Sequence, residues 1–399
     1  MTKMNLKEIL ISIGLTFLPF SELRISFFGI GELIFLYLFL VSQIKHNKIR
    51  KRNRFKKVFS EFWSFFISML LIGFVINVVV FKRYENLDSV FFDFFAYLFV
   101  FIVIITLEKY LVNKMIDVLK ICKLFFILSS SILILLYFIS FSNSTLFGFT
   151  LTRFNHFQPF STNVHHIAMF LSPLFFIGVF VLENTKHKIS KTVILLFLVV
   201  IFFMIQSTNA FKANFGLFAG IIVYLYLLLF KAFDRKSRQT FHFVVFPIFF
   251  LFFLIHFDSI SNYLVEVFIE EDVGSGRRSI YQLALNKIMI SPFFGFGPGA
   301  QIYFNGEFWD AHQTLLTLLL QGGVFAFLSF AFLFLRIIKT VISSPSLFSC
   351  LIAISIYVLG GDILRRLPIW IVLVLIYYFA YKNKRKIRHN RSVMRTSEI

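Results

Sequence analysis

The run QTLLTLLLQGGVFAFLSFAFLFL, residues 313–335, has no charged side chain and decides the class of the fold. A helix that crosses the hydrocarbon core of a bilayer needs about 20 mostly apolar residues. The apolar residues follow one another without the period-2 alternation of a barrel strand. The run therefore predicts a membrane-spanning helix.

The composition of the whole chain agrees with this prediction. Of its 399 residues, 58% are apolar, 15% are charged and 61 are Phe. A soluble domain is about half apolar and about a quarter charged. The composition therefore argues against a soluble globular enzyme.

Further apolar runs predict an all-α polytopic integral membrane protein with about twelve transmembrane helices. The predicted spans are 9–20, 25–44, 58–81, 90–107, 121–140, 165–182, 192–206, 213–230, 241–257, 313–335, 347–360 and 369–381. The first, the seventh and the last are short, so these spans could be tilted or re-entrant.

The chain divides into four predicted parts. Residues 1–257 hold transmembrane helices one to nine, 258–312 form a long outward loop, 313–381 hold helices ten to twelve, and 382–399 form a basic tail. The N-terminal apolar run has no small-residue cleavage motif, so we interpret it as a retained span and not as a signal peptide.

Lysines and arginines orient the predicted helices, and the formal net charge of the chain is +20. With the N-terminus in the cytoplasm, 30 of the 40 basic residues fall in cytoplasmic segments and 10 in outward segments. Cytoplasmic loops of membrane proteins carry such an excess, so both termini are expected in the cytoplasm. The basic run at 45–57 belongs to this topology signal, and contact with anionic lipid headgroups is the alternative. No nucleic-acid partner is expected.

Two outward segments, 141–164 and 258–312, are long enough to carry function. In the second segment, apolar spacing predicts a short amphipathic helix on the membrane surface that ends before Pro292. Its apolar residues are Tyr281, Leu283, Leu285, Ile288 and Met289. The sequence GFGPG at 295–299 indicates a tight turn and not a dinucleotide-binding loop, because no strand precedes it.

Several outward basic residues lie near the ends of spans. A basic group at the edge of the bilayer is costly unless it is paired or meets an anion. A diphosphate headgroup fits this chemistry, and the alternative is local pairing with Glu270, Glu271, Asp272 or Asp362. The basic residues in question are Arg153, Lys212, Arg277, Arg278, Arg365 and Arg366.

His312 lies where the long loop enters the tenth predicted span. An interfacial imidazole can take up a proton near neutral pH, and Asp310 could orient it or act as the base itself. The alternative is a polar cap or an interface anchor beside Trp309. His165 and His166 are expected on the same side, but no spacing specifies a three-histidine metal site.

Other polar residues in or near the spans have simpler interpretations. Cys122 and Cys350 lie far apart in the sequence and indicate neither a disulfide framework nor a metal site. We interpret Glu32, Glu61 and Asp93 as interface or helix–helix hydrogen-bonding residues, with a role in transport as the alternative.

Two stretches, SGRRSIYQLALNKIMISPFFGFGPG (275–299) and AHQTLLTLLLQGGVFAFLSF (311–330), together resemble the bacterial family of O-antigen ligases and O-antigen polymerases. The residues that match the family's pattern in order are Arg277, Tyr281, Pro292, Gly295, Gly297, Gly299, His312 and Gly322. Weaker matches lie at 153–171, which starts with Arg153, at 206–216, where Lys212 stands in place of an arginine, and at 360–370, with Asp362 and Arg365.

The resemblance implies glycosyl transfer at the periplasmic face of the bacterial inner membrane. The implied enzyme is an inverting glycosyltransferase that uses no metal and no cofactor. Its donor is a glycan on undecaprenyl diphosphate, its acceptor is a second glycan, and a chain-length regulator is a further implied partner. The resemblance implies His312 and Asp310 as catalytic residues. The implied diphosphate-binding residues are Arg277, Lys212, Arg365, Arg153 and Arg278.

Three activities stay open at the level of the sequence. A polymerase adds the glycan to another lipid-linked repeat unit, whereas a ligase transfers it to the lipid A core. Ligases of the family often have a His-x-His-Asn sequence, and here Asp310-Ala311-His312-Gln313 keeps only the second histidine. This difference favours the polymerase. A transporter of lipid-linked sugars is the alternative from another class of protein.

Overall fold

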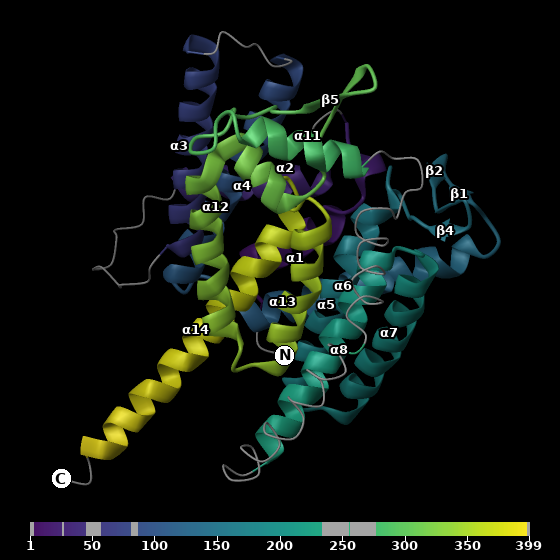
Figure 1. Cartoon of the computed structure of the whole chain (residues 1–399). Coiled ribbons are helices and arrows are strands. Elements are labelled where there is room, and N and C mark those ends of the chain that lie inside the picture. The colour runs from purple at the N-terminus through teal and green to yellow at the C-terminus, as the bar shows by residue number, and fades with distance from the viewer. Residues whose placement is uncertain are drawn as a thin grey trace.

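The computed structural model describes residues 4–25, 28–44, 57–80, 87–233, 255 and 277–396, and this part of the chain is mostly α-helical (Figure 1). Within it, seven helices are long and apolar enough to cross a membrane. They are α3 (Val58–Val79), α4 (Leu87–Val112), α5 (Val118–Ser140), α6 (Val164–Glu183), α7 (Lys188–Ser207), α8 (Phe211–Ala232) and α12 (Thr314–Val341). The prediction of an all-α membrane protein is confirmed.

The remaining apolar helices correspond to the first, second, eleventh and twelfth predicted spans. They are α1 (Leu6–Phe17), α2 (Ile30–Ile44), α13 (Pro345–Gly360) and α14 (Leu367–Thr396). With 12 residues, α1 is too short to cross a bilayer on its own. The count of twelve spans and the orientation therefore stay predictions.

Some of the sequence-based predictions lie outside the described residues. These are the ninth span at 241–257 apart from residue 255, the loop up to residue 276, and the basic run at 45–57 apart from its last residue.

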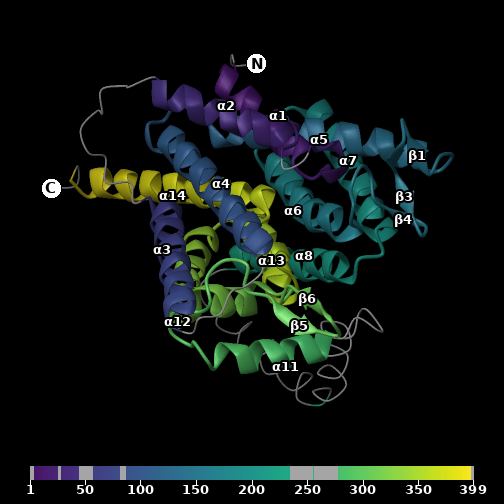
Figure 2. The ribbon, with the colours of Figure 1, turned by 90° about the horizontal axis from the view of Figure 1, so that it is seen from above.

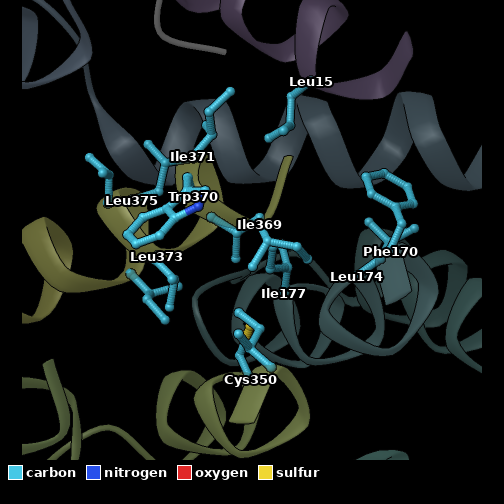
Figure 3. Packing of buried hydrophobic residues seen from close by; sticks show 14 of the residues in the cluster. Leu15, Phe170, Leu174, Ile177, Cys350, Ile369, Trp370, Ile371, Leu373 and Leu375 are labelled. Atoms are coloured by element: carbon cyan, nitrogen blue, oxygen red, sulfur yellow. The ribbon is translucent and has the colours of Figure 1, made fainter. Parts of the chain in front are cut away.

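The helices form two groups around a central helix. Seen from above, α3 and α12 lie on one side and α7 and α8 on the other (Figure 2). The first part of α14 passes between them, and its residues 369–378 are all buried. A helix that is apolar on every side is stable only when it is surrounded. Figure 3 shows Trp370 and its neighbours on α14 packed against Leu15 of α1, Leu174 of α6 and Cys350 of α13.

Helix ends that lie inside this bundle are capped by side chains from other helices. Glu108, in the last turns of α4, accepts hydrogen bonds from the backbone N–H groups of Phe59 and Ser60 at the start of α3. The hydroxyl of Tyr378 on α14 donates to the same carboxylate at 2.9 Å. The first N–H groups of a helix lack partners within the helix, so this carboxylate satisfies them and joins three helices.

The predicted span at 313–335 is present as α12, but it is interrupted. Gly323 has a φ of 67°, which breaks the helix there. The backbone groups that the break releases pair with the GFGPG turn. Phe296 N donates to Leu320 O at 2.8 Å, and Gly297 N donates to Gln321 O at 2.9 Å. A break at membrane depth is tolerated when other backbone groups supply the missing partners.

The predicted tight turn at 295–299 is present and is packed closely. Gly295, Gly297 and Gly299 all have positive φ values. A Cβ atom at Gly297 would lie 2.8 Å from the Cα atom of Phe74 on α3, and one at Gly299 would lie 2.5 Å from the backbone N of Val90 on α4. The turn thus fits between α3, α4 and α12 only with glycine at these positions.

The predicted amphipathic helix is α11 (Arg277–Ile288), which lies across the end of the bundle (Figure 1). Its buried residues are Ile280, Ala284 and Ile288, in a small cluster with Phe296 and other apolar residues. Of the apolar residues predicted for this helix, Leu283, Leu285 and Met289 are exposed and Ile288 is buried, so its place on the membrane surface stays a prediction. The buried face follows the i, i+4, i+8 positions that contact the turn below.

The loops between the helices also hold short strands that the sequence did not predict, and a short 3-10 helix, η1 (Ser21–Leu23). In the described part of the chain, these strands form the two-stranded antiparallel hairpins β1–β2, β3–β4 and β5–β6. Their bounds are β1 (Thr145–Leu146), β2 (Phe149–Thr150), β3 (Thr152–Arg153), β4 (His156–Phe157), β5 (Ile302–Phe304) and β6 (Glu307–Trp309).

Substitution of two glycines with the same backbone conformation tests the packing of the turn. Gly297 and Gly148 both have a φ of +83°, and alanine costs about 1–2 kcal/mol of backbone strain at either one. Only at Gly297 does the new Cβ meet another backbone, whereas at Gly148 nothing lies within 4 Å. We expect a clearly lower melting temperature for purified Gly297→Ala than for Gly148→Ala. Equal melting temperatures would contradict the close packing.

Candidate functional site

Arg365, in the loop between α13 and α14, is held by three carboxylates from separate parts of the chain. Its Nη1 atom lies 2.8 Å from Asp93 Oδ1 on α4, and its Nη2 atom lies 2.5 Å from Asp310 Oδ2 before α12. Its Nε atom lies 3.8 Å from Asp362 Oδ2 in the same loop. Burial on its own would lower the pKa of Arg365, but the three carboxylates raise it well above its usual value. The guanidinium therefore stays charged.

Asp93 is almost fully buried and has further partners. Gln321 Nε2 donates to Asp93 Oδ2 at 2.7 Å, and Gly299 N donates to the same oxygen at 3.1 Å. Tyr97, one turn along α4, donates its hydroxyl to Gln321 Oε1 at 2.8 Å. Gln321 lies at the break in α12 and Gly299 ends the glycine turn. Both irregular segments therefore serve to surround this carboxylate with donors.

Asp310 is held in place from the other side by Gln301. Gln301 Nε2 donates to Asp310 Oδ1 at 3.2 Å, while Gln301 itself accepts from the Ser89 hydroxyl at 3.0 Å and from Lys287 Nζ at 2.8 Å. Burial alone would raise the pKa of Asp310, but attraction and hydrogen bonding from Arg365 outweigh it and lower the pKa. Asp310 is thus an ionised and firmly oriented carboxylate.

His312 is exposed and close enough to Asp310 for its charge to contribute to the lowered pKa of that carboxyl group. Its φ of 50° places it in the left-handed region, where residues other than glycine are strained. Such strain is concentrated at functional sites, where the surrounding structure holds it in place. Here Thr314 N donates to Gly361 O at 2.8 Å, which fastens the segment to the Arg365 loop.

A cavity of about 1230 Å³ lies beside this cluster. Its polar lining includes three arginines and His166 together with three acidic residues, namely Arg24, Arg365, Arg366, His166, Glu32, Asp88 and Asp93. Its apolar lining includes Phe28, Phe91, Phe92, Phe95 and Phe99. The residues that α4 contributes run from Asp88 to Ile102, which corresponds to about 20 Å along the helix. The cavity is therefore long and amphipathic.

Arg366 adds a further guanidinium to the lining of this cavity. Burial and the neighbouring Arg365 lower its pKa to about 10. Among the described residues, its buried Nε atom has no hydrogen-bond partner. Arg24, which also lines the cavity, lies 2.7 Å from Glu32 Oε1. A buried donor without a partner is costly, so this wall of the cavity is suited to an anion.

No protein-family model matches the chain, and no curated protein does. The site therefore has to be interpreted from its own geometry.

The structure brings some of the predicted site residues together and keeps others apart. Asp310 and Arg365 form the cluster, and His312 lies beside them. The sequence suggested Arg365 as a diphosphate ligand, but its guanidinium pairs with carboxylates. One of them, Asp362, is among the local partners that the sequence analysis gave as the alternative.

The other predicted cations lie elsewhere. Arg153 is exposed on β3, and Arg278 is exposed near the start of α11. Arg277 begins α11, but its side chain lies outside the described part of the chain. Lys212 is buried at the start of α8 and does not line the cavity. Their diphosphate-binding roles stay predictions.

Four residues of the site were not on the predicted list. Arg366 belonged to the outward basic set that suits a diphosphate but was not among the implied ligands, and Arg24 had been counted only as an outward charge. Asp93 had been interpreted as a helix–helix hydrogen-bonding residue, and it does accept such a bond from Gln321 on α12. Gln321 carried no sequence signal except its place before two glycines. In the described part of the chain, no group of three or more His, Cys, Asp or Glu residues is arranged to hold a metal ion.

The carboxylates around Arg365 should differ in their effect on stability. Asp93→Asn removes the most deeply buried of the three charges around the guanidinium, and removal of one partner of a buried ion pair typically costs about 3–5 kcal/mol. Asp362→Asn removes a carboxylate whose Oδ2 is 3.8 Å away and keeps an oxygen that can accept from Leu364 N. We expect thermal unfolding in detergent to show a large loss for Asp93→Asn and a small one for Asp362→Asn. The reverse order would show that Asp93 does not anchor the cluster.

Proposed function

We propose that this chain is a membrane-embedded glycosyltransferase whose donor is a glycan linked to a polyprenyl diphosphate. The observation that carries the proposal is the amphipathic cavity, in which Arg366, Arg24 and His166 line the same space as a row of phenylalanines on α4. A ligand that fits such a lining has a strongly anionic head and a long apolar tail. The resemblance described above provides a reason to choose a lipid-linked glycan.

The donor diphosphate is assigned to Arg366 and Arg24. Arg366 has an unsatisfied buried donor, and phosphate oxygens accept hydrogen bonds from guanidinium groups well. The polyprenyl tail would lie along Phe91, Phe92 and Phe95, which are exposed on α4. Arg365 then has a different role from the one expected, because it positions Asp310 and does not hold the donor.

His312 is assigned as the base. The acceptor hydroxyl oxygen attacks the anomeric carbon, the bond from that carbon to the diphosphate oxygen breaks, and the hydroxyl proton passes to the imidazole. Inversion at the anomeric carbon follows from a single displacement. The negative charge that develops on the leaving diphosphate is stabilised by fixed cations. Asp310 favours the protonated imidazole that the transfer produces.

The preferred activity is that of an O-antigen polymerase at the periplasmic face of the inner membrane, with both termini in the cytoplasm. Transfer to the lipid A core is the alternative within the same chemistry. Transport of lipid-linked sugars is the alternative from another class, and the oriented Asp310 next to His312 favours catalysis over it.

Removal of the base tests the proposal directly. Purified protein in nanodiscs is given lipid-linked repeat units from its host, and the products are separated by length. His312→Ala should slow chain extension by about 10²–10⁴-fold. His187→Ala is the matched control, because His187 is exposed before α7. Unchanged extension by His312→Ala contradicts catalysis and favours transport, whereas transfer only to added core lipid identifies a ligase.

The assignment of the diphosphate to Arg366 is tested by a pair of arginine variants. Arg366→Gln should raise the donor concentration needed for half-maximal rate by about tenfold or more, since a hydrogen bond to a charged group is worth about 1.5–3 kcal/mol. Arg336→Gln is the control, because Arg336 does not line the cavity and instead lies 3.9 Å from the exposed Glu61 and over the ring of Phe332. If the two variants reach half-maximal rate at the same concentration of the glycan donor, Arg366 does not bind the donor diphosphate.

A further inference from the structure

The hairpin β5–β6 leads directly into the proposed catalytic residues. Its three pairs are Ile302 with Trp309, Tyr303 with Phe308, and Phe304 with Glu307. Asn305 and Gly306 form the tip, with φ values of 51° and 87° that suit a tight two-residue hairpin turn. After β6 the chain continues to Asp310 and His312. The hairpin and the base are thus parts of one short segment.

One face of this hairpin is packed and fixes its position. Ile302 is buried in the cluster with Ile280 and Ala284 of α11, and Phe304 and Trp309 pack against the same cluster. At the base of the hairpin, Gln301 donates to Asp310 at 3.2 Å. The hairpin therefore cannot tilt without disturbing the carboxylate that lies beside His312.

The other face carries two aromatic side chains where polar ones are expected. Successive residues of a strand point to opposite faces, and the solvated face of a hairpin is normally polar. Tyr303 and Phe308 lie directly opposite each other on this face, with ring centroids 5.2 Å apart and planes at 60°. They are nevertheless 62% and 51% exposed.

The other described hairpins lack this arrangement. In β1–β2 and β3–β4, the exposed aromatic residues Phe147 and Phe154 sit singly at the turns and not in a cross-strand pair. Exposed apolar groups that are held rigidly and gathered together mark a binding surface. The pair in β5–β6 thus has a feature that packing of the chain does not explain.

The surroundings of the pair favour a sugar as its occupant. A pyranose ring has an apolar face of C–H groups that stacks on an aromatic ring, and a rim of hydroxyls that needs polar partners. Asn305 and Glu307, both exposed, flank the aromatic pair and provide such partners. The hairpin extends past α11 at the end of the molecule (Figure 1), and the cavity assigned to the lipid is lined by Gln301 and Arg365, the two side chains that donate to Asp310.

We infer that Tyr303 and Phe308 form a binding platform for a sugar ring of the acceptor glycan, which holds the acceptor hydroxyl within reach of His312. This inference rests on the proposed glycosyl transfer and adds a residue-level acceptor subsite to it. The donor and the acceptor then approach the Asp310–His312 segment from different sides.

The platform is tested with the full chain in nanodiscs by varying the acceptor at a fixed donor concentration. Tyr303→Ala and Phe308→Ala should each raise the half-saturating acceptor concentration by about tenfold, with the donor dependence and the maximal rate unchanged. Tyr303→Trp and Phe308→Trp should restore acceptor binding, because they keep an aromatic face. Phe147→Ala and Phe154→Ala are the matched controls and should behave as the unmodified chain.

A second measurement does not depend on catalysis. Oligosaccharides released by mild acid from the host's own surface polysaccharide are mixed with the protein, and contact is detected by saturation-transfer NMR. The signal should be lost in the Tyr303→Ala/Phe308→Ala double variant and kept in the Phe147→Ala/Phe154→Ala double variant. Equal NMR signals in both double variants would overturn the platform. So would variants of Tyr303 and Phe308 that weaken donor binding and lower the maximal rate together with acceptor binding.

The two proposals can fail separately. If His312→Ala abolishes chain extension while the Tyr303 and Phe308 variants keep normal acceptor dependence, the platform is wrong and the transferase stands. If the unmodified protein binds the oligosaccharides through Tyr303 and Phe308 but forms no product, the platform stands and the transferase is wrong.

Discussion

The site depends on one buried cation, the guanidinium of Arg365. A charge at the edge of a bilayer is expensive unless it is paired, and here Asp93 and Asp310 pair it at 2.8 and 2.5 Å. These contacts join α4, the segment before α12 and the loop between α13 and α14. Removing one carboxylate would leave the cation poorly compensated, which typically costs more than the pair itself contributes. The position of His312 is therefore tied to the packing of distant helices.

The break in α12 is the second condition for this arrangement. A continuous helix would keep its own backbone hydrogen bonds and would leave no place for the glycine turn. Because Gly323 interrupts it, the carbonyls of Leu320 and Gln321 accept from the turn. The same turn then presents the N–H of Gly299 to Asp93. The glycines that looked like a loop signature are thus needed for close packing inside the bundle.

The sequence predicted the helices well and the site only in part, for physical reasons. Apolar runs locate helices because a spanning segment must be continuously apolar, and Asp310 and His312 could be linked because they are adjacent in the chain. The pairing of Asp93 with Arg365 spans 272 residues, and hydropathy carries no information about such a contact. The face of α11 that packs against the protein was not predicted for a similar reason, since the turn beneath it selects Ile280 and Ala284.

The two neighbouring arginines illustrate this limit and give the proposed reaction its geometry. Arg365 and Arg366 are neighbours in the sequence, but the first is surrounded by carboxylates, whereas the second lines the cavity and its buried Nε has no hydrogen-bond partner among the described residues. A displacement at an anomeric carbon needs a proton acceptor on one side and a stabilised leaving anion on the other. In the proposed reaction, the carboxylate that Arg365 holds beside His312 and the arginine that lines the cavity would meet these two needs separately.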